Sequence, residues 1–157
     1  MGIADVTTRP ATPKDAEAVT EVFLTSRQTT MPYLPRVHSD DETRWWVTNI
    51  MLPESTVWVA AADARIVGFC ALNGTELEHL YLRPEWLRQG IGTTLLKLAT
   101  EQSPRLLELK VFQRNENARA FYERHGFVAI DSNDGSRNEE NEPDMTYRWA
   151  PLVEFGA

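Results

Sequence analysis

Two glycines separated by one residue, Gly90 and Gly92, open a segment of helical periodicity directly after a strand-like run. Glycine is the poorest ordinary helix former and costs about 1 kcal/mol relative to alanine at each such position. One glycine would suffice to turn the loop, whereas two leave the first helical turn uncovered by side chains. The pattern therefore predicts a strand–loop–helix unit in which something approaches the backbone closely.

Length and composition favour one globular domain spanning residues 1–157, with 42% hydrophobic and 25% charged residues. The net charge of −7 disfavours a nucleic-acid partner, because such partners select basic surfaces. No apolar run reaches the length of a membrane span, and the N-terminal stretch lacks a signal-peptide pattern. We therefore expect a cytoplasmic protein with no membrane partner. The single cysteine, Cys70, excludes an internal disulfide and is expected to be a buried, inert thiol.

The acidity is concentrated in residues 131–144, which hold six acidic residues and one arginine. This segment has almost no aliphatic or aromatic side chain to bury. Its composition predicts a solvated, mobile loop.

The first half of the chain reads as a strand, two helices and three strands. Thr12 caps a helix that runs to about Ser26, and residues 28–38 form an irregular loop. Ser39 and Glu42 form the capping box of a second helix. The three strands are expected at 55–63, 65–74 and 75–84, the first two joined as a hairpin around Asp63.

The second half alternates helix and strand. The glycine pair opens a helix from about Gly90 to Ser103, a strand follows at 105–113, and Gly126 ends a further helix that starts at Asn115. Final strands lie at 127–131 and 144–151. The strand–helix–strand unit at 76–111 predicts a parallel pair with a right-handed crossover. The fold class is α/β: a mixed, mostly antiparallel sheet with one parallel βαβ unit and helices on both faces.

A helix N-terminus that follows a strand offers free backbone N–H groups to a phosphate. A P-loop would need a lysine after its glycines, and Thr93-Thr94 stand there instead. A dinucleotide fingerprint would need a third glycine at Leu95. Neither of these two phosphate-binding designs fits.

The stretch "LYLRPEWLRQGIGTTLL" resembles the acetyl-CoA-binding motif of the GNAT superfamily of N-acetyltransferases. The later stretch "NENARAFYERHGF" is similar to the second cofactor motif of that superfamily. The two motifs stand in the family's order, separated by one strand, and the similarity spans about residues 6–149. The resemblance implies a single GNAT domain that uses acetyl-CoA as co-substrate and no metal.

By this resemblance, the cofactor would meet the strand before the loop, the loop itself and the following helix starts. Leu87 stands where the family has Arg or Gln, so the phosphate contact there must come from backbone N–H groups. Arg88 either supplies compensating charge or points into solvent. The cofactor-binding residues implied are Leu80, Tyr81, Leu82, Leu87, Arg88, Gln89, Gly90, Ile91, Gly92, Thr93, Asn115, Ala118 and Tyr122.

The resemblance also implies catalytic roles. Bases of this superfamily recur nine and eleven residues before the Arg/Gln position, which gives Glu78 as first choice and Glu76 as second. A carboxylate there would remove the amine's proton, although an exposed strand-face role would explain both side chains equally. Strand alternation puts both glutamates on the face of Leu80 and Leu82, and Leu77, His79 and Tyr81 on the other. His79 is therefore read as structural.

Tyr122 is expected to protonate the leaving thiolate, with the backbone N–H of Leu80 or Leu82 holding the oxyanion. The reaction implied is direct attack of an amine on acetyl-CoA, without an acyl-enzyme. Asn115 is expected both to cap its helix and to contact the pantetheine.

The acceptor pocket is expected between the first helices and the last hairpin, with an apolar lining of Met31, Tyr33, Leu34, Trp45 and Trp46. The acidic loop either steers a cationic amine or only solubilises the chain. A small amine, amino-acid derivative or peptide N-terminus is the favoured acceptor.

Two alternatives stay open: a non-catalytic acyl-CoA-binding module of the same fold, and another nucleotide-binding α/β protein. Homodimers are common in the superfamily, and the sequence indicates no surface for one.

Overall fold

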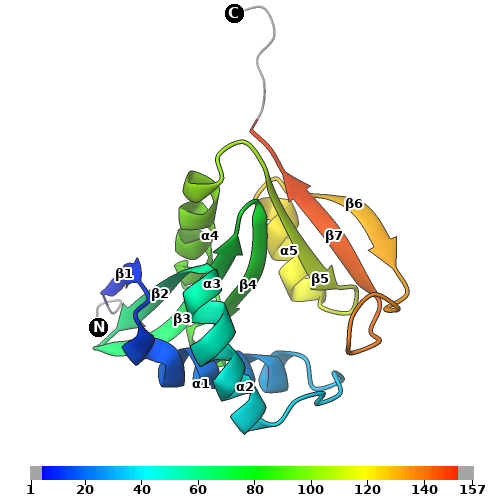
Figure 1. Ribbon diagram of the computed structural model, residues 1–157. Helices are drawn as coiled ribbons and strands as arrows, with labels where there is room; N and C mark the ends of the chain where they lie inside the picture. Colours follow the sequence, from blue (N-terminus) through cyan, green and yellow to red (C-terminus); the bar gives the residue numbers. More distant parts are fainter. Residues whose placement is uncertain (1–4, 152–157) are drawn as a thin grey trace, which may run out of the picture.

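The computed structural model describes residues 5–151, which build a single seven-stranded sheet in the order β1-β2-β3-β4-β5-β7-β6 (Figure 1). All neighbouring strands are antiparallel except β4 and β5, which are parallel. This confirms the predicted mixed sheet. The strands are β1 (Val6–Pro10), β2 (Thr56–Ala62), β3 (Arg65–Asn73), β4 (Glu76–Leu82), β5 (Leu107–Phe112), β6 (Val128–Asn133) and β7 (Asp144–Trp149).

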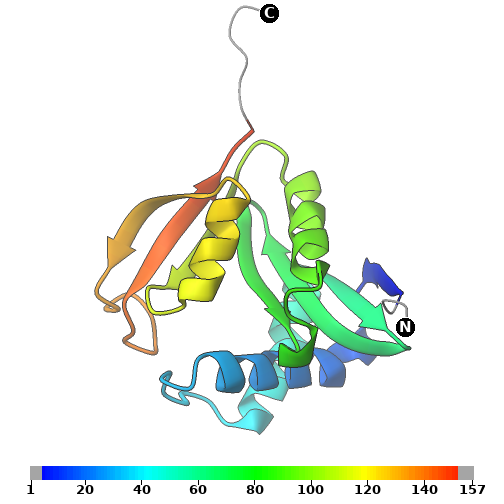
Figure 2. The same cartoon turned by 180° about the vertical axis from the view of Figure 1, so that it is seen from behind.

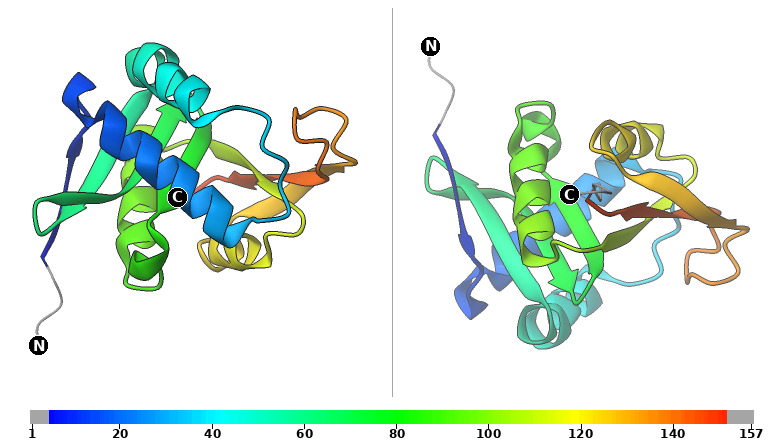
Figure 3. Two further views of the ribbon diagram at one scale, coloured as in Figure 1. Left: turned by 90° about the horizontal axis from the view of Figure 1, so that it is seen from below. Right: turned by 90° about the horizontal axis from the view of Figure 1, so that it is seen from above.

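Helices cover both faces of the sheet, as Figure 2 shows from behind and the two panels of Figure 3 show from below and from above. One face carries α1 (Ala16–Thr30), α2 (Asp40–Trp46) and the short α3 (Leu52–Glu54). The other face carries α4 (Ile91–Gln102) and α5 (Glu116–Arg124). Each face has its own apolar core, and the strands β2, β3 and β4 contribute side chains to both.

Local sequence signals explain most element ends. Ser39 Oγ accepts a hydrogen bond from the Glu42 N–H at 3.1 Å, and the Glu42 carboxylate accepts one from the Ser39 N–H at 2.9 Å. Gly126 follows α5 in the left-handed conformation at φ +87°, as a C-terminal glycine should. Helix α1 continues to Thr30 rather than ending near Ser26, because no helix-breaking residue occurs before Pro32.

A bulge in β4 changes the alternation expected for this strand. Ala71 of β3 lies opposite His79, but the next residue, Leu72, lies opposite Leu77, so Glu78 is an extra, unpaired residue. The side-chain alternation therefore shifts by one residue at Glu78.

The shift overturns the predicted facing of Leu77, whereas His79 and Tyr81 lie opposite Leu80 and Leu82 as predicted. Leu77 joins Leu80 and Leu82 on the α4–α5 face instead of lying opposite them. His79 and Tyr81 lie on the α1–α2 face, where both contact the ring of Phe23. No helix within residues 5–151 is long and apolar enough to cross a membrane.

Candidate active site

The parallel strands β4 and β5 pair at one position only, Glu76 with Glu108, and then separate. Beyond this pair the edge of β4 that faces β5 has no ladder partner. The Arg83 N–H donates to the Val67 carbonyl of β3 at 2.8 Å, so alternation directs the amides of Leu82 and Leu80 towards the open side. Free backbone donors inside a cleft can hold an extended ligand or an oxyanion.

The two glycines at the start of α4 serve different purposes. Gly90 is the N-cap residue, with φ +85°, and a Cβ added there would meet nothing within 4 Å. Its backbone conformation selects glycine, and the space beside it is open to a ligand. A Cβ on Gly92 would instead lie 3.3 Å from the Phe121 ring of α5. Gly92 therefore also permits close packing of the two helices, a reason that the sequence motif does not reveal.

Some of the other predicted cofactor-binding residues around the start of α4 are exposed, and others are buried or hydrogen-bonded within the protein. Leu87 is 43% exposed and Arg88 and Gln89 are exposed beside it, so all three are available to a ligand at the helix N-terminus. Ile91 is buried in the core. The Thr93 hydroxyl lies 3.2 Å from His125 Nε2. Arg88 has a left-handed backbone at φ +62°, which tightens the turn before Gly90.

Helix α5 places Tyr122 in the core that α4 and α5 share. Tyr122 is 8% exposed, and burial, together with the nearby Tyr81 and Cys70, raises the pKa of its hydroxyl above the ordinary value. The hydroxyl therefore stays protonated at neutral pH and can donate a proton. At the start of α5, Asn115 accepts a hydrogen bond from the Ala118 N–H at 3.3 Å, as an N-cap residue does.

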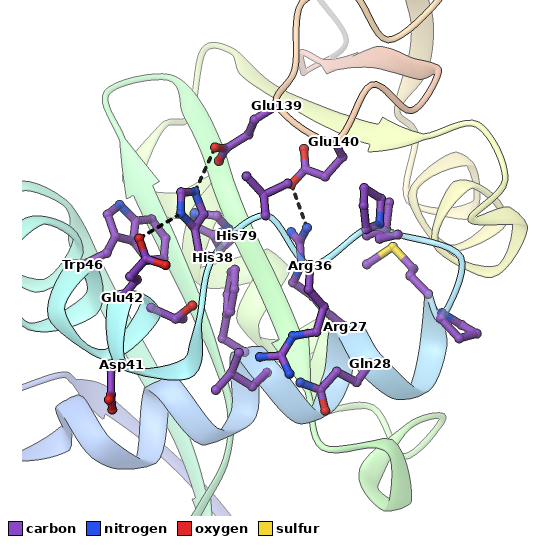
Figure 4. Close-up of a pocket in the computed structure, with 18 of the residues that line it drawn as sticks. Arg27, Gln28, Arg36, His38, Asp41, Glu42, Trp46, His79, Glu139 and Glu140 are labelled. Atoms are coloured by element: carbon purple, nitrogen blue, oxygen red, sulfur yellow. Dashed lines mark hydrogen bonds and ion pairs between the residues drawn. The ribbon is translucent and has the colours of Figure 1, made fainter.

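A cavity of about 870 Å³ opens on the α1–α2 face (Figure 4). Its walls come from α1, the linker to α2, α2 itself, β4 and the β6–β7 loop. It is lined by Phe23, Leu24, Arg27, Gln28, Met31, Pro32, Leu34, Pro35, Arg36, Val37, His38, Asp41, Glu42, Thr43, Trp45, Trp46, His79, Glu139 and Glu140.

Four of the five predicted apolar lining residues are present: Met31, Leu34, Trp45 and Trp46. Trp46 packs on Phe23, whereas Trp45 is 61% exposed. The fifth, Tyr33, lies outside the cavity, with its ring 4.0 Å beneath the Arg114 guanidinium.

Only part of the acidic segment is the solvated loop that its composition predicts: Asp131, Asp134 and Glu139 are exposed, whereas its C-terminal part is buried. Glu142 and Asp144 are 8% and 5% exposed, and Arg114 donates two hydrogen bonds to Glu142 at 2.8 and 2.6 Å. The composition does not reveal these partners: Glu142 pairs with Arg114 outside the segment, and Asp144 accepts hydrogen bonds from Asn133 and Asn138 within it. The loop forms a wall of the cavity, and His38 pairs with Glu139 of this loop on one side and with Glu42 of α2 on the other (Figure 4).

Arg27, near the end of α1, contacts several elements around the cavity, and no sequence pattern predicts this role. Its guanidinium donates to Glu140 at 2.9 Å and to the Tyr81 hydroxyl at 3.3 Å. It also lies 5.1 Å from the Phe23 ring and 6.0 Å from the Phe112 ring. Arg27 therefore links α1 to both strands of the open pair and to the acidic loop.

The predicted bases do not line this cavity. Glu78 is exposed and accepts a hydrogen bond from the Ser55 hydroxyl at 3.0 Å. Glu76 borders a separate, smaller pocket of about 220 Å³ beside Glu108 and Lys110. The titratable β4 side chain that does line the cavity is His79. In the described part of the chain, no group of three His, Cys, Asp or Glu side chains is placed to hold a metal ion.

Comparisons with known proteins identify the family of this chain. The family model described as "Acetyltransferase (GNAT) domain" matches residues 53–129. Peptidyl-lysine N-acetyltransferase YjaB of Escherichia coli is 31% identical over 107 residues, which are 68% of this chain and 69% of that protein. The chain belongs to the GNAT acetyltransferase family.

Further similarities extend over nearly the whole chain. Peptidyl-lysine N-acetyltransferase YiaC of Escherichia coli is 26% identical over 153 residues, covering 93% of this chain and 97% of that protein. The solution structure of YjaB from Escherichia coli in its apo form superposes with a TM-score of 0.76 at 24% identity, covering 92% of this chain and 97% of that one. As a GNAT protein, the chain is an acetyl-CoA-dependent N-acetyltransferase.

Proposed function

We propose that the chain transfers the acetyl group of acetyl-CoA to the primary amine of a small molecule, an amino-acid derivative or a peptide N-terminus. The observation that carries this proposal is the cavity on the α1–α2 face. Its volume of about 870 Å³ lies in the range of small-ligand sites. A folded acceptor could offer it no more than a side chain or a chain end.

The lining of the cavity suits an amine. Phe23, Trp45 and Trp46 supply aromatic surface for the carbon chain, and aromatic faces attract cations. Asp41, Glu42, Glu139 and Glu140 add carboxylates, although each of the four also pairs with Arg or His. Because YjaB and YiaC are named peptidyl-lysine N-acetyltransferases, lysine-containing peptides belong among the acceptors to be tested.

The reaction proposed is direct attack. The neutral amine attacks the acetyl carbonyl carbon, forming a C–N bond, and the backbone N–H groups of Leu80 and Leu82 stabilise the resulting oxyanion. The C–S bond then breaks, and Tyr122 gives its proton to the departing thiolate. The amine nitrogen must lose one proton, and Glu78 and Glu76 are the acceptors that the family resemblance implies.

The test is release of coenzyme A from acetyl-CoA with monoamines, diamines, amino acids, and peptides with or without lysine. We expect release that depends on the acceptor, and a loss of about 100-fold in kcat for Tyr122→Phe with acetyl-CoA affinity unchanged. Cys70 should add little background, because burial raises the pKa of its thiol to about 12. Binding of acetyl-CoA without release for any amine would instead support the non-catalytic alternative.

A further inference from the structure

His79 is the β4 side chain that meets the proposed acceptor cavity. It lies on the α1–α2 face, opposite Leu80 and Leu82 as strand alternation predicts, and lines the cavity. Glu78, the extra residue of the bulge, does not line the cavity, and its carboxylate accepts a hydrogen bond from Ser55 just before β2. His79 is therefore the only residue of β4 in the cavity wall formed by the described residues.

The imidazole of His79 is held in a fixed orientation by aromatic rings. Its centroid lies 5.2 Å from Trp46 and 5.7 Å from Phe23, both edge-to-face, and 6.0 Å from Tyr81 in a stacked arrangement. Nδ1 is buried without a hydrogen-bond partner. Nε2 is not among the buried atoms and has no hydrogen-bond partner within residues 5–151, so it is the nitrogen that can meet a ligand in the cavity.

The charges around His79 favour a neutral ring. Arg27 approaches from α1, with Glu140 of the β6–β7 loop bound to it, and the Tyr81 hydroxyl lies beside it on β4. Trp46 of α2 and Phe23 of α1 carry no charge. Burial, followed by the positive charge of Arg27, lowers the pKa of His79 to about 4. The lone pair of the ring is therefore free throughout the neutral range.

We infer that Nε2 of His79 accepts the proton that the acceptor amine loses, an inference that rests on the proposed function. As the C–N bond forms, the nitrogen becomes positively charged, and one of its N–H protons passes to Nε2. The C–S bond breaks, and the thiolate takes the Tyr122 proton. The imidazolium then returns its proton through solvent to the tyrosinate, so atoms and charges balance. This role requires the Nδ1–H tautomer.

The first test compares two substitutions of His79 with one of Glu78. His79→Phe keeps an aromatic ring in the cluster and removes the proton acceptor, and His79→Gln keeps a polar group that cannot titrate. We expect kcat to fall about 100-fold in both variants. At least one of the two variants should keep the acetyl-CoA affinity and the thermal midpoint of unfolding of wild type. Glu78→Gln tests the rival proton acceptor, and Glu101→Gln, at an exposed glutamate near the end of α4, is the control that should stay within about threefold of wild type.

The pH profile separates proton transfer from simple positioning. The neutral amine attacks in every variant, so wild type and the His79 variants should share a rise of about tenfold per pH unit below the pKa of the amine. The ratio of wild-type to His79→Gln activity should stay constant above pH 5 and fall towards pH 4, where the His79 ring becomes protonated. A His79→Gln enzyme with wild-type kcat, or a loss confined to Glu78→Gln, would overturn the assignment and leave acetyl transfer intact. Absence of release by wild type with every amine would instead refute the proposed function itself.

A second measurement does not depend on turnover. The chain has three histidines, so ¹⁵N-histidine NMR spectra of wild type and His79→Gln assign the His79 ring. We expect the Nδ1–H tautomer when coenzyme A and an amine are bound, with no titration of the ring above pH 5. An Nε2–H tautomer in that complex would contradict the inference.

Discussion

At the scale of single residues, Gly90 and Gly92 of the motif are required for different reasons. Gly90 has an open flank and a left-handed backbone, whereas Gly92 faces the Phe121 ring. The motif predicts both positions correctly as glycine-requiring but attributes both to the ligand. Packing against a second helix supplies part of the reason, and packing is not visible before the two helices are placed.

Gly90→Ala should weaken acetyl-CoA binding because its methyl group and strained backbone lie at the helix N-terminus. Gly74→Ala is the matched control, since Gly74 also has a positive φ, +61°, and open space around it. Each change should lower the free energy of unfolding by about 1 kcal/mol. Calorimetric titration should show reduced affinity for Gly90→Ala alone. Equal affinity in both variants would argue against a phosphate site at Gly90.

Residues whose roles depend on contacts with distant segments could not be identified from the sequence. Tyr122 and Asn115 stand at motif positions and could be named in advance. Arg27 could not, because its importance comes from Tyr81, Phe112 and Glu140, which fold around it from three distant segments. His79 was read as structural because alternation directs it away from the face of Leu80 and Leu82, and the cavity that α1, α2 and the β6–β7 loop form on its own face is not visible in the sequence.

At the scale of elements, capping boxes and turns were predictable, since their hydrogen bonds join residues close in sequence. The β2–β3 hairpin, for example, turns on Asp63 and Ala64, both with positive φ. The β4 bulge was not predictable, because it is defined by the register against β3. The packing of the acidic loop was not predictable for a similar reason: Glu140 and Glu142 pair with Arg27 and Arg114, which lie far away in the sequence.

The junction of β1 and α1 should be sensitive to acid. Asp15, at the start of α1, accepts two hydrogen bonds from Arg9 at 2.7 and 2.9 Å and one from the Thr12 N–H, which lowers its pKa to about 2. Because the folded pKa lies below the unfolded value of about 3.9, this stabilisation is complete above pH 4 and is lost as pH falls towards 2.

We expect the ionised Asp15 to contribute about 1.5 kcal/mol to the free energy of unfolding at neutral pH. This value already allows for the exposure of Arg9 to solvent. Urea unfolding of wild type and Asp15→Asn at pH 7 and pH 2.5 measures it. The variant should be less stable at pH 7, and the gap should narrow at pH 2.5. A gap independent of pH would show that the ion pair is not its source.

The contact between α1 and the acidic loop can be tested by a double-mutant cycle. The Arg27 and Glu140 side chains are 20% and 12% exposed, so Arg27→Met and Glu140→Gln should each cost about 2 kcal/mol, with a coupling energy of about 1 kcal/mol. The exposed pair Arg137 and Asp131 in the same region is the control, and its coupling should stay below about 0.5 kcal/mol. Similar coupling in both pairs would mean that Arg27 does not hold the loop.

At the scale of the whole molecule, two arms of one sheet meet at a single residue pair, Glu76 with Glu108. One arm is β1 to β4, and the other is β5, β7 and β6. The overall architecture could be predicted because the βαβ unit and the hairpins are local. The opening between the arms could not, because strand separation is a property of tertiary packing.

A ligand that occupies the opening should stabilise both arms together. Acetyl-CoA at 100 times its dissociation constant should raise the free energy of unfolding by about 2.7 kcal/mol, as mass action requires for binding to the folded state only. Urea unfolding followed by tryptophan fluorescence and by circular dichroism measures the rise. The two signals should shift together, whereas a shift in only one would mean that the arms unfold separately.

In the function proposed above, the two ligands approach this sheet from opposite faces. The acetyl donor has its loop beside α4 and α5, and the acceptor cavity belongs to α1, α2 and the β6–β7 loop. Evolution can therefore exchange the acceptor through a few surface segments while the donor machinery stays untouched. The same separation is useful in protein engineering. A library of variants at residues 31–46 and 139–140 would sample new acceptors while the residues on the donor side stay unchanged.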